Sequence, residues 1–201
     1  MPLNLPPLPK ISEVQRTNPI GLIPVLVAPL DIYLQYYRYI QDNFVTHSHD
    51  FELAYRRFYM KSAARSWTGS DFRTYFDLMY AANENSTVES FNDSLIEQLS
   101  LGVSNFSFAS KAIHTINPST PIYDRLIRNY LSTYERVRYL SNPVGRDNQL
   151  RAYSQITNWF NNFMNNDPRY NSWIEWFDKT FSNYSTISNV KKIDFIILSC
   201  K

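Results

Sequence analysis

Two residues of this chain, Lys111 and Asp124, are of types that could do chemistry together. They lie in the stretch SFASKAIHTINPSTPIYDRLI, residues 107–127. An unprotonated amine can act as a nucleophile, and a carboxylate can stabilise positive charge that develops in a transition state. Taken singly, a lysine at the edge of a helix face is usually solvated, and an aspartate just before a helix is usually a cap. The two residues are therefore either ordinary surface charges or two halves of one active site.

The elements around these residues would give both a defined position. A helix beginning near Ser107 gathers its apolar residues on one broad face, since each residue turns the helix by about 100°. Lys111 lies at the border of that face, so its aliphatic stem can pack on the core while its amine points into a cleft. Asp124 follows the proline-bracketed loop INPSTPIY and precedes the amphipathic run RLIRNYLSTYERVRYL. This pattern predicts that Asp124 is the N-cap of the next helix.

Most of the chain has a helical pattern, because apolar residues recur at three- and four-residue steps and strand-like alternation is scarce. Residues 1–29 hold seven of the eleven prolines, which predicts an irregular arm that wraps over the core. Residues 30–201 are expected to form a single helical domain. Ser86 and Glu89 have the spacing of a capping box, which predicts a helix start there. The predicted helices are 30–43, 49–66, 70–82, 87–100, 107–116, 125–140, 147–164, 169–181 and 188–198.

Composition and charge narrow the classes of function. A chain of 201 residues with 44% hydrophobic residues can build one compact core, divided into two small lobes that share a cleft. The formal charge is only +2, so a surface for nucleic acid must come from local clusters of Arg and Lys. The single cysteine, Cys200, excludes an internal disulfide framework and a thiolate cage for a metal. His47 and His49 lack a third ligand at a convincing spacing, so we expect neither a metal nor a cofactor.

The apolar stretch IGLIPVLVAPL, residues 20–30, bears on location. It is interrupted by two prolines and is far shorter than the ~20 residues that a membrane-spanning helix needs. The pattern of a signal peptide, with a basic segment before an apolar core and a cleavage site, is not evident. We therefore expect a cytoplasmic protein with no membrane partner.

Residues 86–140 resemble the helix-hairpin-helix DNA glycosylases, in particular the 8-oxoguanine glycosylase branch. VESFNDSLIEQL looks like the first helix of that motif, SLGVSNFS like its hairpin, and FASKAIHTI like its second helix. PIYD stands where the family carries its aspartate element. By position, Lys111 corresponds to the nucleophile and Asp124 to the catalytic acid. The family hairpin generally has two glycines shortly before the lysine, where this chain has Ser107 and Ala109.

The resemblance implies an all-α fold, a helix-hairpin-helix glycosylase-like bundle in two small lobes around a cleft. It implies a monomeric enzyme that binds double-stranded DNA, flips out a modified base and excises it, leaving an abasic site. Attack by Lys111 would form an imine, whose elimination would also nick the strand. Candidate phosphate contacts are Ser104, Asn105 and Ser107 at the hairpin, and Arg125, Arg128 and Arg146 beyond it. For any one of these arginines, an ordinary solvated charge is the simpler interpretation.

Three functions stay open at this point. The first rests on the resemblance alone, because some relatives of this glycosylase group act in bacterial defence: it is a specialised glycosylase of antiviral defence, acting on a base such as the glucosylated hydroxymethylcytosine of phage DNA. The second is an 8-oxoguanine repair glycosylase with AP lyase activity. The third is a noncatalytic helix-hairpin-helix module that binds DNA and uses Lys111 as a phosphate contact. An enzyme should bury Lys111 opposite Asp124 across a cleft, whereas a binding module should present Lys111 outward.

Overall fold

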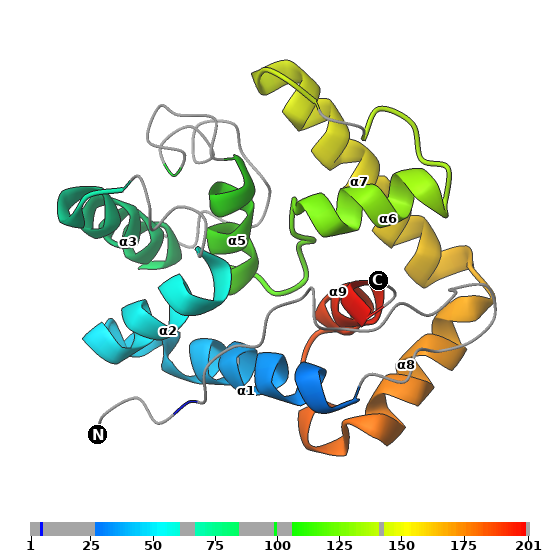
Figure 1. The fold of residues 1–201 in the computed structure, drawn as a ribbon, viewed down its shortest axis with the longest axis horizontal. Helices are drawn as coiled ribbons and strands as arrows, with labels where there is room; N and C mark the ends of the chain where they lie inside the picture. The colour runs from blue at the N-terminus through cyan, green and yellow to red at the C-terminus, as the bar shows by residue number, and fades with distance from the viewer. Residues whose placement is uncertain are drawn as a thin grey trace. The chain divides into compact units, whose positions relative to one another are not determined.

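The computed structural model contains only helical elements in the residues that it describes, so the all-α prediction is confirmed there (Figure 1). None of these helices is long and apolar enough to cross a membrane. The chain divides into two compact units, the first including Ala28–Asn117 and the second Pro118–Lys201. The described residues are 5, 27–60, 67–84, 99, 106–140 and 143–199.

Side-chain caps set the starts of two helices in the first unit. Ser48 Oγ accepts an amide hydrogen bond from the first turn of α2. Thr68 and Asp71 form a reciprocal pair at the start of α3: Asp71 Oδ2 accepts from the Thr68 amide at 2.7 Å, and Thr68 Oγ1 accepts from the Asp71 amide at 3.3 Å. The capping box expected at Ser86 and Glu89 lies outside the described residues. The helical elements of this unit are α1 (Val27–Asn43), η2 (Phe44–Thr46), α2 (His49–Tyr59), α3 (Gly69–Glu84) and α5 (Phe106–Ile116).

Aromatic rings fill the core of the first unit. Phe51 and Tyr55 of α2 both pack edge-on against Phe76 of α3, at centroid distances of 6.1 and 5.5 Å. The hydroxyls of Tyr55 and Tyr75 are hydrogen-bonded at 2.8 Å, and Tyr75 donates in turn to the carbonyl oxygen of Phe108 at 2.8 Å. This buried chain of hydrogen bonds ties α2 and α3 to the main chain of α5, the helix that carries Lys111.

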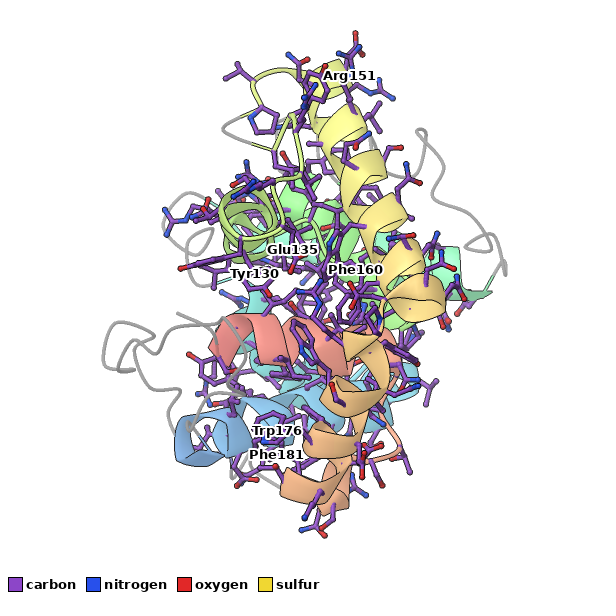
Figure 2. All side chains as sticks on the ribbon, turned by 90° about the vertical axis from the view of Figure 1, so that its right-hand side faces the viewer. Tyr130, Glu135, Arg151, Phe160, Trp176 and Phe181 are labelled. Atoms are coloured by element: carbon purple, nitrogen blue, oxygen red, sulfur yellow. The ribbon has the colours of Figure 1, made fainter. Side chains whose placement is uncertain are left out.

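In the second unit, α9 lies between α6 and α8 and contacts both (Figure 1). Its apolar residues are buried on nearly all sides, as the long apolar run in its sequence requires. Phe160 is buried on α7 (Figure 2). At the end of α8 the rings of Trp176 and Phe181 meet edge-on, with their centroids 6.0 Å apart. The helical elements of this unit are α6 (Arg125–Thr133), α7 (Arg146–Asn166), α8 (Arg169–Thr180), η4 (Ser182–Tyr184) and α9 (Asn189–Ser199).

Most predicted helices begin and end within a few residues of the observed ones, but several boundaries were wrong. The first helix starts at Val27 and takes in the last residues of the predicted arm, since a proline is tolerated in a first turn. The predicted helix 49–66 ends at Tyr59, with Met60 as its C-cap. The predicted helix 125–140 ends at Thr133. Of the predicted helix 87–100, only residue 99 is described, and it is helical. Of the rest of the arm, only residue 5 is described.

The early end of α6 has a backbone cause. Arg136 and Tyr139 have φ values of 54° and 65°, which a continuing right-handed helix cannot contain. The amide of Val137 turns back to donate to the carbonyl oxygen of Leu131 at 3.0 Å. The chain therefore leaves the helix through a turn that non-glycine residues form.

Candidate functional site

Lys111 is one of the three residues of α5 that keep some exposure. Ser107, Lys111 and Ile116 are partly buried, while the other residues of this helix are buried. The Nζ atom of Lys111 donates to the carbonyl oxygen of Tyr59 at 3.3 Å and lies 5.5 Å from the centroid of the Phe108 ring. A carbonyl oxygen accepts the proton of an ammonium, and a ring face attracts its charge. Both contacts therefore suit a protonated Lys111.

The buried surface of α5 is wider than the apolar face that the sequence predicts. Ser110, His114 and Thr115 are also buried. The hydroxyls of Ser110 and Thr115 donate to carbonyl oxygens of their own helix at 3.0 and 2.9 Å. The Nε2 atom of His114 is 3.2 Å from the hydroxyl oxygen of Tyr37, and the two rings also pack together. Polar groups satisfied in this way can enter a core, which apolar periodicity alone does not reveal.

Asp124 is the N-cap of α6, as the sequence predicts. Its backbone is extended, with φ −122° and ψ 150°, and its Oδ1 atom accepts a hydrogen bond from the Leu126 amide at 2.8 Å. The side chain is partly buried. A carboxylate at this place lies at the positive end of the helix dipole, where negative charge is favoured.

Side chains from the same unit hold the loop that leads to Asp124. The hydroxyl of Ser188, just before α9, donates to the carbonyl oxygen of Pro118 at 2.6 Å. The hydroxyl of Tyr153, on α7, donates to the carbonyl oxygen of Pro121 at 2.9 Å. The Tyr153 phenol is a donor at neutral pH, and burial raises its pKa further. The position of Asp124 within the second unit is thus fixed by α7 and α9 as well as by its own cap.

The predicted partners belong to different units. Lys111 lies in the first unit and Asp124 in the second, and the boundary falls between Asn117 and Pro118. Their pairing across a cleft stays a prediction. Ser104 and Asn105 lie outside the described residues, so the predicted hairpin contacts also stay predictions.

Two of the three arginines predicted to contact phosphates, Arg125 and Arg128, lie on α6 and have different surroundings. Arg125 is exposed on the first turn of α6. Arg128 is partly buried, and its Nη1 atom donates to the carbonyl oxygen of Leu140 at 3.1 Å. The guanidinium carbon of Arg128 also lies 5.0 Å from the centroid of the buried Tyr123 ring. Of these two residues, Arg128 therefore holds the chain after α6, and Arg125 presents an exposed charge.

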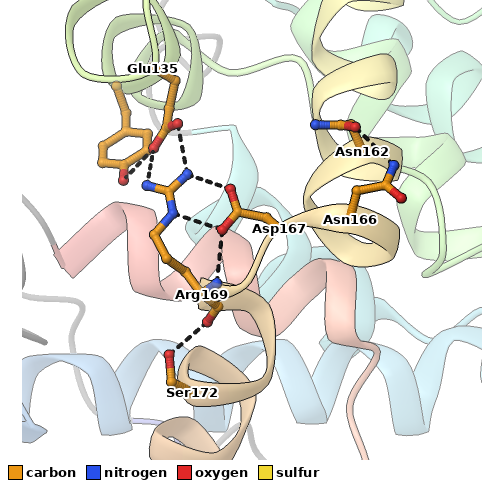
Figure 3. Close-up of polar contacts among 7 residues, drawn as sticks. Glu135, Asn162, Asn166, Asp167, Arg169 and Ser172 are labelled. Carbon is orange, nitrogen blue, oxygen red and sulfur yellow. Dashed lines mark hydrogen bonds and ion pairs between the residues drawn. The ribbon is translucent and has the colours of Figure 1, made fainter.

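Sequence reasoning missed an ion cluster centred on Arg169 (Figure 3). The guanidinium donates to both carboxylate oxygens of Glu135, at 2.9 and 3.0 Å, and to both of Asp167, at 2.9 and 2.7 Å. Tyr130 donates to Glu135 at 3.3 Å. Hydrogen bonds from Arg169 lower the pKa of Asp167. The cluster fastens the end of α6 to the turn between α7 and α8, and the only sequence signal was the turn-forming run NNDPR.

Two buried lysines on α9 were also missed. Lys191 and Lys192 are almost fully buried, and lysine is rarely so unless it is paired. Lys192 Nζ is 2.7 Å from a carboxylate oxygen of Asp178 on α8, and Lys191 pairs with the carboxylate of Asp194 one turn further along α9. The pair with Asp178 joins α9 to α8, whereas the pair with Asp194 lies within α9 and compensates the buried charge of Lys191 there. The only signal in the sequence was a pair of lysines at the start of an apolar run.

No protein-family model, curated protein or solved structure matches the chain. In the part of the chain that the structure describes, no group of three or more His, Cys, Asp or Glu residues could hold a metal ion. The class that the described residues define is an all-helical protein of two compact units.

Proposed function

We propose that the protein is a DNA glycosylase that flips a modified base out of the duplex and excises it, leaving an abasic site. The observation that supports this best is the setting of Asp124, whose carboxylate caps α6 after a loop held at Pro118 and Pro121. The resembled family carries its catalytic aspartate at this point of the motif. Lys111 lies on the helix to which the same resemblance assigns the nucleophile.

In this reaction the bond between the base and C1′ of the sugar breaks, and its electron pair leaves with the base. Positive charge develops on the sugar, and the Asp124 carboxylate would stabilise it. Water then attacks C1′, its proton passes to the carboxylate, and the departing base takes a proton from solvent. The role needs an ionised carboxylate, which the helix N-terminus favours.

Lys111 could act in either of two ways. To attack C1′ it must lose a proton and leave the carbonyl oxygen of Tyr59, to which it donates. As an ammonium it would instead supply positive charge close to a phosphate. Its contacts with Tyr59 and with the Phe108 ring suit the charged form, so we place attack by water first.

The proposed substrate is a bulky modified cytosine, such as the glucosylated hydroxymethylcytosine of phage DNA, in the double-stranded form. An added group gives the enzyme a feature to bind that normal bases lack, and this makes strong discrimination possible. We propose accordingly a monomeric cytoplasmic enzyme of antiviral defence. Oxidised guanine is the alternative base.

A second candidate is a noncatalytic module that binds DNA. The observation that favours it is again the charged setting of Lys111, because a lysine that serves only as a phosphate contact needs no deprotonation. Such a module would bind DNA with Asp124 acting as a cap alone.

The experiment incubates duplexes carrying 8-oxoguanine, uracil, hydroxymethylcytosine or glucosylated hydroxymethylcytosine with the protein, and measures abasic sites by alkaline cleavage. Asp124→Asn removes the charge but keeps a good N-cap, so the variant should stay folded and bind DNA while excision is lost. Asp71→Asn, at the start of α3, is the matched control and should excise normally. Borohydride added in parallel traps any Lys111 imine.

The outcomes separate the candidates. Fastest release of glucosylated hydroxymethylcytosine supports the defence enzyme, and release of 8-oxoguanine alone supports repair. A wild-type protein that binds every duplex and excises nothing rejects the glycosylase and leaves the binding module. Excision by Asp124→Asn at the wild-type rate contradicts the role given to the carboxylate.

A further inference from the structure

Exposed aromatic and cationic side chains gather where the chain passes from α6 to α7. Among the described residues, four large apolar or aromatic side chains are exposed, and Tyr134, Tyr139 and Val144, at 49%, 61% and 75%, lie in this connection. Exposed arginines stand on both sides of Tyr139 along the chain and on α7. We call the set of Arg136, Arg138, Tyr139, Arg146 and Arg151 the arginine–tyrosine surface.

The backbone of this surface is held in an uncommon conformation. Left-handed φ values at two residues with large side chains, Arg136 and Tyr139, cost on the order of 1 kcal/mol each. The conformation persists because Leu140 is buried and its carbonyl oxygen accepts a hydrogen bond from Arg128. The chain thus buries Leu140 and presents the neighbouring Tyr139 to solvent, at a conformational cost that points to a function.

Tyr139 is supported from one side. The guanidinium carbon of Arg151, on α7, lies 5.7 Å from the centroid of the Tyr139 ring. Figure 2 shows Arg151 at one end of α7, well away from Glu135 and Phe160. Because the Tyr139 side chain keeps 61% of its exposure, part of the ring stays open to a second planar group. Planar groups that stack on a tyrosine beside an arginine include the bases of nucleic acids.

The local charge fits a phosphate backbone. Arg136, Arg138, Arg146 and Arg151 are all exposed. Glu135 is bound by both Nη atoms of Arg169, which leaves Asp147 as the exposed carboxylate within residues 134–151. The segment therefore concentrates positive charge in a chain whose formal charge is only +2. Arginine fits phosphate well because its planar fork can donate two parallel hydrogen bonds.

We propose that the arginine–tyrosine surface binds unpaired DNA, with Tyr139 stacked on a base and the arginines on the phosphates. It lies outside the segment predicted to form the hairpin, and the inference rests on the proposed function only in naming DNA as the nucleic acid. A strand from which a base has been flipped offers the unpaired, unstacked nucleotides that such a surface binds.

The test measures the fluorescence anisotropy of a short labelled single-stranded oligonucleotide and of the same strand built with abasic sugars. Tyr139→Ala loses one stacking contact, so it should bind the base-bearing strand roughly tenfold more weakly than the wild type does. Binding of the abasic strand should not change, and Tyr139→Phe should bind nearly as the wild type does. The double variant Arg136→Gln, Arg138→Gln should bind both strands more weakly, and should lower the slope of log affinity against log salt by about 1.4. Arg73→Gln with Lys179→Gln, exposed charges elsewhere, is the matched control and should leave that slope unchanged.

Equal weakening of the two strands by Tyr139→Ala would overturn the inference, since it would mean a plain polyanion surface. Tighter binding of a fully paired duplex, or of RNA of the same sequence, would also overturn it. Thermal melting of each variant checks that it is folded. The assay does not depend on excision. If the protein releases no base but shows the expected anisotropy differences, the proposed glycosylase activity is rejected and the proposed role of the arginine–tyrosine surface stands.

Discussion

Lys111 of α5 donates to the carbonyl oxygen of Tyr59, the last residue of α2, at 3.3 Å. The carbonyl groups at the end of a helix carry partial negative charge, so they favour a cation. The bond thus ties two helices of the first unit together and holds the amine in a setting that suits its charged form. Any nucleophilic role for Lys111 requires this bond to break first.

Replacing Lys111 by Met should separate its structural role from its chemical one. Met keeps an apolar stem but removes the donor, so the free energy of unfolding should fall by about 1 kcal/mol in a urea titration. Lys111→Arg, which keeps a charged donor, should lose less. If imine formation occurs, Lys111→Met should also abolish borohydride trapping. A Met variant as stable as the wild type would show that the bond to Tyr59 contributes nothing.

Substitutions at Asp124 should show how much the N-cap contributes. Asp124→Ala removes the acceptor of the Leu126 amide and should lower the free energy of unfolding by about 1 kcal/mol. Asp124→Asn should stay within a few tenths of the wild type, because Asn caps nearly as well. The measurement is chemical denaturation of all three proteins. Equal losses for Ala and Asn would mean that the charge, and not the capping bond, stabilises α6.

The helix starts were predictable because the interactions that fix them are local. Asp124 caps a helix whose first apolar residues follow at once, and the spacing that signals a cap is visible in the sequence. The same logic would have found the pair Thr68 and Asp71, which has the spacing of a capping box with Asp as its acid. The end of α6 was missed, because Arg136 and Tyr139 adopt left-handed conformations that their residue types do not signal.

Ion pairs between distant residues were missed for a different reason. Lys192, which is buried, and Arg169, which is exposed, find partners in Asp178 and Glu135. These partners are distant in sequence, so hydropathy alone predicts neither ion pair. The meeting of Lys111 and Asp124 is a question of the same kind. It depends on contacts between residues of two units, which no local pattern decides.

The buried hydroxyl of Tyr75 should contribute more to the free energy of unfolding than hydroxyls nearer the surface do. Tyr75→Phe removes the hydrogen bonds that this group makes with Tyr55 and with the Phe108 carbonyl oxygen, and should lower the free energy of unfolding by about 1–3 kcal/mol. Tyr80→Phe is the matched control, because its hydroxyl makes a longer bond of 3.3 Å to a partly exposed Glu52. It should cost less than about 1 kcal/mol. Equal costs for the two variants would rule out a special contribution from the buried network.

Asp167 should make stability depend on pH in the acid range. Hydrogen bonds from Arg169 lower the pKa of Asp167 in the folded protein. In the unfolded chain the pKa of this carboxyl should be about 3.9. The unfolded state therefore binds the proton more readily, so the stabilisation is fully present above the unfolded pKa and is lost as pH falls through the lower, folded pKa. Asp167→Asn should be less stable than the wild type by about 1–2 kcal/mol near neutral pH, a range that allows for the exposure of Arg169.

The difference between the two proteins should shrink as the pH falls below about 4, because protonation removes from the wild type the same charge that the substitution removes. Urea titrations at a series of pH values would measure it. Asp77→Asn, at an exposed position of α3, is the control and should differ little from the wild type at any pH. A difference for Asp167→Asn that stays constant down to the acid limit would show that Arg169 does not stabilise the ionised carboxylate, and the cluster with Glu135 would then owe its contribution to packing alone.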